Sequence, residues 1–143
     1  MTDVDCLHIN KLLGFIPAVA IMVLIYYFSA QSNVPAVAVD AQLAAVAGHL
    51  VAYGALTVAL FLVFEHAGWE SRRAALWGFA GASLYGATDE IHQFFVPGRH
   101  ADPIDLLTNA MGAAFFLWVF LSVRTYLPES IGRRVLSQTR RRS

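Results

Sequence analysis

The sequence predicts an all-α membrane protein, a compact antiparallel bundle of four transmembrane helices. Hydrophobic residues make up 57% of the 143 residues and charged residues only 14%, whereas a soluble domain usually has about 25% charged residues. The apolar residues gather in four long runs with short polar connections between them. Short connections make successive helices antiparallel neighbours. We therefore expect one transmembrane domain, without an internal repeat or a second domain.

Each apolar run is close to the length that a membrane requires. About 20 residues, rising about 1.5 Å each, cross a hydrocarbon layer about 30 Å thick. The first run ends in bulky aromatic residues rather than in the small residues of a cleavage site, so we expect it to stay uncleaved. The predicted helices are residues 12–29, 43–64, 74–95 and 104–126.

The positions of Lys and Arg predict the orientation. Basic residues flank the first helix at Lys11, separate the second and third at Arg72 and Arg73, and fill the tail 127–143. The other two loops contain only Arg99. Because cytoplasmic loops carry the excess of Lys and Arg, we expect a multi-pass protein with both termini in the cytoplasm and a basic cytoplasmic tail.

The strongest chemical signal is a pair of carboxylates, Asp89 and Glu90, near the end of the third run. A carboxylate at membrane depth costs several kcal/mol unless it is paired, hydrogen-bonded or protonated. Gln93 lies one turn beyond Asp89 and Tyr85 one turn before it, which predicts a polar wedge pointing into the bundle. A Pro-Gly pair then turns the chain, so that Arg99 can return to a buried carboxylate as its ion-pair partner.

The other three helices bring polar residues to the same end. Asp105 and Asn109 are four residues apart at the start of the fourth helix, His49 and Tyr53 are four apart in the second, and Gln31 follows the first. Because the helices alternate in direction, we expect one outward-facing polar pocket. Its predicted binding residues are Glu90, Asp89, Gln93, Arg99, Asp105, Asn109, His49, Tyr53 and Gln31, and the candidates for catalysis are Asp89, Glu90 and His49.

Packing alone accounts for part of this pattern. Asn109 and Gly112 suit close contact between helices, and a helix end in the wet interface explains Ser29. Buried polar networks can also simply fix helix register. A second carboxylate beside Asp89 has no such structural necessity, which favours a functional role for Glu90.

We expect no metal, cofactor or nucleic acid. The hard carboxylate oxygens and the imidazoles at this end are possible metal ligands, but their spacing matches no H-E-x-x-H motif and Arg99 would oppose a cation, so a metal site is the minority alternative. The single cysteine, Cys6, has no partner for a disulfide or a metal site. The terminal Arg run is better explained by topology and by contacts with anionic lipid headgroups than by nucleic acid.

The polar pattern resembles the signature of the VanZ-like membrane proteins, D-E-x-x-Q-x-F-x-P-x-R followed by D and N-x-x-G. The matching residues are Asp89, Glu90, Gln93, Phe95, Pro97, Arg99, Asp105, Asn109 and Gly112, with Ser29-x-Gln31-Ser32 and His49-x-x-x-Tyr53 upstream. Phe116 departs from the family pattern, in which a small residue often follows, so packing low in the last helix is expected to differ.

The resemblance implies a protein of a bacterial inner membrane, in a family whose founding member is associated with reduced susceptibility to teicoplanin. Three functions stay open. The pocket could bind a membrane lipid, a lipid-linked cell-wall precursor or a lipoglycopeptide. Paired carboxylates with separated pKa values could instead make it an intramembrane acid–base enzyme. The bundle could also be a structural scaffold.

Overall fold

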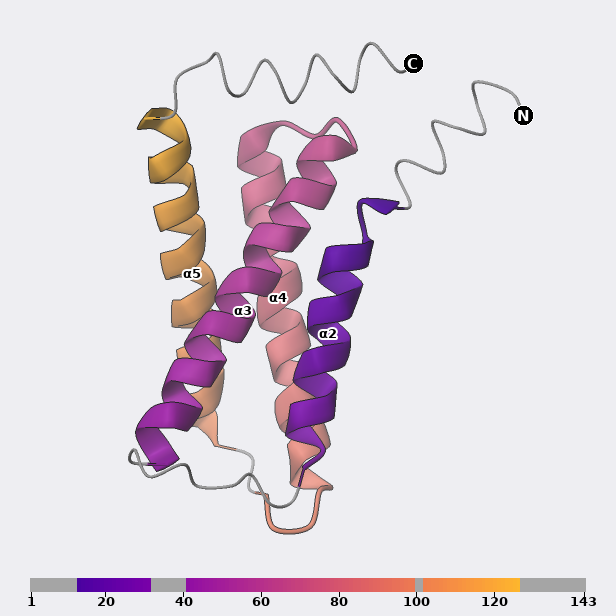
Figure 1. The fold of residues 1–143 in the computed structure, drawn as a ribbon, viewed down its shortest axis with the longest axis vertical. Coiled ribbons are helices and arrows are strands. Elements are labelled where there is room, and N and C mark those ends of the chain that lie inside the picture. Colours follow the sequence, from indigo (N-terminus) through magenta and orange to yellow (C-terminus); the bar gives the residue numbers. More distant parts are fainter. Residues whose placement is uncertain (1–12, 32–40, 100–101, 127–143) are drawn as a thin grey trace, which may run out of the picture.

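The computed structural model describes residues 13–31, 41–99 and 102–126. Within them the chain is entirely helical, and the expected all-α class is confirmed (Figure 1). The predictions for Cys6, Ser32 and the basic tail 127–143 lie outside the described residues. The helices are α2 (Ile16–Ser29), α3 (Ala41–His66), α4 (Ser71–Phe94) and α5 (Pro103–Tyr126).

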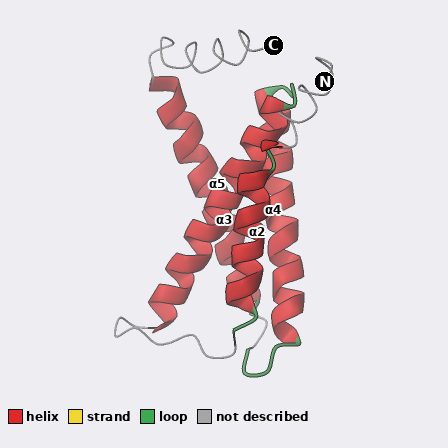
Figure 2. Cartoon of the chain, turned by 45° about the vertical axis from the view of Figure 1, so that its right-hand side comes forward, coloured by secondary structure: helices red, strands yellow, loops and turns green. Residues whose placement is uncertain are grey.

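The four helices alternate in direction and lie side by side (Figures 1 and 2). Helix α3 is central and contacts α2, α4 and α5, whereas α2 contacts only α3 and α4 substantially. The ends of α2 and α4 therefore lie at the same end of the bundle as the starts of α3 and α5. This arrangement positions the polar residues of all four helices near one another.

The helix ends differ from the predicted boundaries by a few residues. Helix α2 begins at Ile16 rather than at residue 12, with a proline in its first turn, where the missing backbone donor is harmless. Helix α4 begins at Ser71, three residues before the predicted start. The Ser71 hydroxyl donates a 2.7 Å hydrogen bond to Glu65 Oε1. Between α3 and α4 the chain turns at Gly68, whose φ of 91° favours glycine.

Two of the helices are long and apolar enough to cross a membrane: residues Leu43–His66 of α3 and all of α5. Only 39% and 28% of their apolar windows are buried inside the protein, so neither is the enclosed core helix of a soluble domain. Helix α2 is apolar but has 14 residues, about 21 Å of helix. Helix α4 does not meet the same criterion. The structure thus supports two of the four expected spans directly.

The distribution of side chains is the reverse of that in a soluble protein. Large apolar residues face outward on every helix; Leu84, Phe94 and Trp118 are 68%, 70% and 65% exposed. Polar residues lie inside instead, an arrangement suited to an apolar solvent. The buried polar residues are Ser29, Thr57, Asp89, Glu90, Gln93, Thr108 and Asn109.

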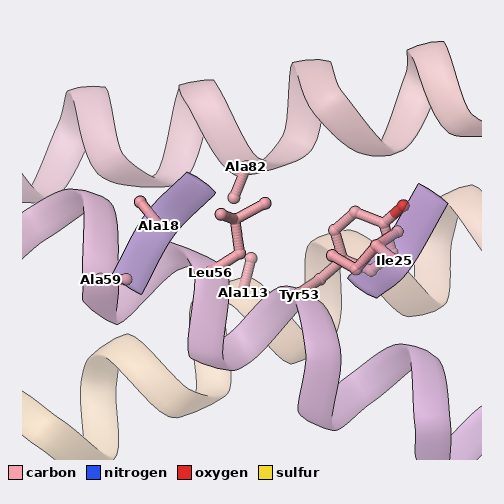
Figure 3. Close-up of a cluster of buried hydrophobic side chains, with 7 residues drawn as sticks. All are labelled: Ala18, Ile25, Tyr53, Leu56, Ala59, Ala82 and Ala113. Atoms are coloured by element: carbon pink, nitrogen blue, oxygen red, sulfur yellow. The ribbon is translucent and has the colours of Figure 1, made fainter. Parts of the chain in front are cut away.

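Small residues let the helices approach closely. Helix α4 buries Ala74, Gly78, Ala82 and Gly86, one per turn, on the stripe that ends at Glu90. A Cβ on Gly78 would lie 3.0 Å from the Phe61 backbone nitrogen of α3. In the core, Leu56 projects between Ala82 and Ala113 (Figure 3). Such close contact is the usual basis of helix association in membranes.

The seam between α3 and α5 uses glycines from both helices. A Cβ on Gly112 would collide with the Leu50 backbone, lying 2.7 Å from its Cα, so α5 requires glycine here. Further along, Phe116 of α5 fills the space that a side chain on Gly54 would occupy, with its Cβ 2.8 Å from that position. The large residue at the position where the family pattern is small is therefore accommodated by Gly54 on the facing helix.

Candidate functional site

Asp89 is the centre of a hydrogen-bond network that joins three helices. Its side chain is 4% exposed. Its Oδ2 accepts hydrogen bonds from Ser29 Oγ of α2 (2.8 Å), Tyr53 Oη of α3 (2.9 Å) and Gln93 Nε2 of α4 (3.0 Å). Gln93 Nε2 also reaches Ser29 Oγ at 3.3 Å. We call these four residues the Asp89 network.

Ser29 belongs to this network, and its assignment to a wet helix end was wrong. The side chain is 6% exposed and donates to a carboxylate 60 residues away in the sequence. The sequence signal for this role is the Ser29-x-Gln31-Ser32 pattern, which does not indicate the group that the Ser29 hydroxyl binds. The sequence alone does not distinguish a serine at the membrane interface from a serine that binds a buried carboxylate.

Glu90 faces a different set of groups from its neighbour, as the turn of about 100° between adjacent helical residues requires. It is 8% exposed. Its Oε2 accepts a 3.1 Å hydrogen bond from the Asp102 backbone N–H, whereas its Oε1 is buried without a hydrogen-bond partner. The titratable groups whose charges act on Glu90 are Asp105, His49 and Asp89.

His49 and Asn109 form the wall opposite Glu90. His49 Nδ1 and Asn109 Oδ1 are 2.8 Å apart and link α3 to α5. Since a carbonyl oxygen can only accept, Nδ1 carries the proton in this orientation. Asn109 is 1% exposed, and its Nδ2 is buried without a partner. That nitrogen lies 3.3 Å from a Cβ built on Gly86, one turn before Glu90.

We call Glu90, His49, Asn109 and Asp105 the Glu90 cluster. Asp105 and His49 are half-exposed, whereas Glu90 and Asn109 are buried. The cluster holds one unused acceptor and one unused donor. Buried polar atoms without partners are uncommon in folded proteins and call for an explanation.

Arg99 pairs with none of the carboxylates that the structure describes, which corrects the expected ion pair with Asp89 or Glu90. Its Nε donates to Gln31 O at 3.2 Å and its Nη2 to Phe28 O at 3.1 Å. Both carbonyls lie at the C-terminal end of α2, where the partial negative charge of the helix favours a cation. Arg99 therefore ties the turn after α4 to the end of α2. Among the described residues, the salt bridge is Arg124–Glu65, at 2.7 Å and at the opposite end.

Two other predicted polar residues lie outside the two groups. The Gln31 amide donates to Tyr27 O at 3.3 Å within its own helix. The Tyr85 hydroxyl donates to the backbone oxygen of Met22 at 2.7 Å, and so joins α4 to α2 instead of extending the wedge to Asp89. His92 stacks on the ring of Tyr26, with centroids 4.6 Å apart.

Asp102 contributes to the site although the sequence reasoning did not select it. Its Oδ1 accepts from the Ile104 N–H at 2.8 Å, and so caps the start of α5. The same residue offers its own N–H to Glu90. An Asp followed by Pro103 at the first helical position is the sequence signal that would have found it.

In the part of the chain that the structure describes, no three His, Cys, Asp or Glu side chains are grouped so that they could hold a metal ion. An open groove of about 530 Å³ lies in the other half of the bundle. It is lined only by glycine and apolar residues of α2, α3, α5 and the turn before α2, among them Gly14, Ala59 and Phe120. This groove is separate from the predicted polar site.

Comparison with known proteins identifies the family. The VanZ/LLP1 family model matches residues 3–124, which include both the Asp89 network and the Glu90 cluster. No curated protein and no solved structure shows a significant match. Together with the two helices that are apolar enough to span a bilayer, this match indicates a membrane protein. The chain belongs to the VanZ/LLP1 family.

Proposed function

We propose that this chain is a four-span protein of a bacterial inner membrane that binds the polar part of a lipid-like envelope molecule at the Glu90 cluster. Membrane lipids, a lipid-linked cell-wall precursor and a lipoglycopeptide of the teicoplanin type are the ligands considered. The outward-facing apolar side chains of α2 and α4 support their inclusion as spans beside α3 and α5.

The distribution of basic residues supports the orientation. Arg72, Arg73 and Arg124 lie at one end of the bundle, whereas Arg99 lies at the other. By the positive-inside rule the first end is cytoplasmic. Both termini are then cytoplasmic, and the Glu90 cluster lies near the outer face, where envelope precursors and antibiotics are encountered.

The observation that carries the proposal is the unused bonding capacity of the Glu90 cluster. Glu90 Oε1 and Asn109 Nδ2 are both buried without partners. Each such atom costs about 1–3 kcal/mol. A ligand that satisfies both atoms recovers this free energy on binding, whereas a purely structural network gains nothing by leaving them unpaired.

An acid–base enzyme acting on a lipid-linked substrate is the second candidate. Two carboxylates were expected to share the acid and base roles, but three donors already bind Oδ2 of Asp89. The observation favouring an enzyme is therefore narrower: Glu90 has a free oxygen, and His49 is among its titratable neighbours. Turnover of a lipid-linked substrate that is lost in both Glu90→Gln and His49→Gln would favour it over binding.

The first test compares Glu90→Gln with Glu70→Gln. Glu70 is an exposed carboxylate at the opposite end, without a side-chain cap hydrogen bond, so the same chemical change there is a matched control. Cells producing equal amounts of each protein are compared for teicoplanin susceptibility, and the purified proteins for thermal melting in detergent. We expect Glu90→Gln to lose any protective effect of the wild type while melting normally, and Glu70→Gln to keep both.

If the wild type alters teicoplanin susceptibility and Glu90→Gln alters it to the same extent, the role of the Glu90 cluster is refuted. If the wild type itself has no effect on susceptibility, the lipoglycopeptide is excluded as ligand, and binding of lipids by the same variants becomes the deciding measurement. A Glu90→Gln protein that melts far below the wild type would instead favour the scaffold.

A further inference from the structure

We infer that the Glu90 cluster recognises a primary ammonium group followed closely by an oxygen acceptor, as in the ethanolamine headgroup of a phospholipid. This inference rests on the proposed function and specifies its ligand. The juxtaposition that carries it is a buried free carboxylate oxygen, a buried free amide N–H₂ and an excess of acidic groups around them.

The charge at this end of the bundle is negative. Asp89, Glu90, Asp102 and Asp105 lie at the end of α4 and the start of α5. Within the described residues of these segments, the one Arg or Lys is Arg99, and its guanidinium is engaged by two backbone carbonyls of α2. An anionic group would therefore meet carboxylates without a free cation among these residues.

The unused acceptor calls for a hydrogen-bond donor. Glu90 Oε2 already holds the Asp102 N–H, while Oε1 has no partner. An ammonium group has three N–H donors and no acceptor. It can satisfy Oε1 and donate to a second carboxylate, for which Asp105 is the candidate because its charge acts on Glu90. Hydrogen bonds between charged partners are about twice as strong as neutral ones.

The unused donor calls for an acceptor close by. Asn109 Nδ2 is buried beside Gly86, one turn from Glu90 on the same stripe of α4. Gly86 brings the α4 backbone close to these two side chains, since a Cβ would lie 3.2 Å from Tyr53 Cε1 and 3.3 Å from Asn109 Nδ2. A phosphate or ester oxygen a few bonds from the ammonium could accept from Nδ2.

A membrane lipid is the source to which we commit. His49 and Asn109 are carried by α3 and α5, the two helices that are apolar enough to cross a bilayer. Around the cluster, α4 and α5 present apolar side chains outward, including Ile91 and Leu107, which are 63% and 61% exposed. His49 and Asp105 are both half-exposed, so the headgroup would reach the cluster beside them from the lipid side.

The test measures lipid binding to the purified full chain in detergent by native mass spectrometry. Dioleoyl phosphatidylethanolamine is compared with dioleoyl phosphatidylcholine, which has the same net charge but no N–H, and with dioleoyl phosphatidylglycerol, which is anionic. We expect the ethanolamine lipid to bind most tightly. Glu90→Gln should weaken it about tenfold, the usual effect of losing one charged hydrogen bond, while Glu70→Gln leaves it unchanged.

The outcomes separate this inference from the proposed function. Tightest binding of phosphatidylglycerol or phosphatidylcholine, lost in Glu90→Gln, would overturn the ammonium assignment and keep the site. Equal binding of all three lipids by the wild type and by Glu90→Gln would overturn both. Asn109→Asp serves as a second variant, because an oxygen replaces the donor N–H₂ and should weaken binding of the ethanolamine lipid. The other oxygen can keep the contact with His49, so an unchanged melting temperature is the structural control.

Discussion

Asp89 and Glu90 are adjacent in the sequence and equally buried, yet the structure gives them opposite surroundings. Asp89 receives three hydrogen bonds on one oxygen, from α2, α3 and α4. Glu90 receives one, from the backbone at the start of α5, and keeps its other oxygen free. The rotation of about 100° between adjacent helical residues thus separates a carboxylate oxygen with three donors from a carboxylate oxygen with none.

The difference shows how one polar motif can serve two purposes. A buried carboxylate that accepts hydrogen bonds from several helices fixes the positions of the helices that supply the donors. A buried carboxylate with spare capacity destabilises the folded protein by itself, and is retained where a ligand uses it. We therefore interpret the Asp89 network as structural and the Glu90 cluster as the binding site.

The largest effect is expected from Asp89→Ala. It leaves Ser29, Tyr53 and Gln93 without their acceptor in the bundle interior. At about 0.6–1.7 kcal/mol for each hydrogen bond in a membrane protein, the loss of unfolding free energy is roughly 2–5 kcal/mol. Unfolding in mixed detergent micelles measures it. A variant as stable as the wild type would show that the Asp89 network does not hold the helices together.

A second prediction concerns the seam that places Asn109 against His49. In Gly112→Ala the new methyl group meets the Leu50 backbone, which cannot move aside without separating α3 from α5. Overpacking of this kind costs about 1–3 kcal/mol. Gly48→Ala is the control on α3, because a Cβ there has nothing within 4 Å. The same unfolding measurement applies, and equal stability of the two variants would contradict the close approach.

A third prediction separates Arg99 from both carboxylates. Arg99→Gln removes two hydrogen bonds to the end of α2 and should cost about 1 kcal/mol. Because Arg99 is not paired with Glu90, the double variant Arg99→Gln/Glu90→Gln should show additive changes in unfolding free energy, to within about 0.5 kcal/mol. A larger coupling would restore the ion pair that the sequence suggested.

The sequence predicted the helices and the end at which their polar residues meet, because apolar runs and chain direction determine both. It also singled out the residues of the Glu90 cluster and three of the four in the Asp89 network. It could not predict their partners. A guanidinium five residues beyond the end of α4 is as able to bind backbone carbonyls as carboxylates, and only the position of α2 decides between them.

The same limit explains the other differences. Ser29 and Tyr85 each bind a group on a different helix, so no spacing within one helix reveals the contact. Asp102 acts through its backbone N–H as well as its side chain, and a backbone donor has no residue type to recognise. The pairing of Gly54 with Phe116 likewise depends on which faces of α3 and α5 meet.

The smallest change in stability is expected from Glu90→Gln, which completes the comparison of the two carboxylates. The amide oxygen of glutamine can accept from the Asp102 N–H as Oε2 does, and the free position loses a charge that no group in the described site neutralises. Removing an unpaired buried charge offsets the poorer fit of the amide, so the unfolding free energy should change by no more than about 0.5 kcal/mol.

Asp89→Asn is the matched substitution at the adjacent residue. It should cost more, since its new N–H₂ would face donors from Ser29, Tyr53 and Gln93 if it took the place of Oδ2. Measuring both variants under one set of micelle conditions tests the assignment directly, because equal losses would mean that the two carboxylates have the same structural role.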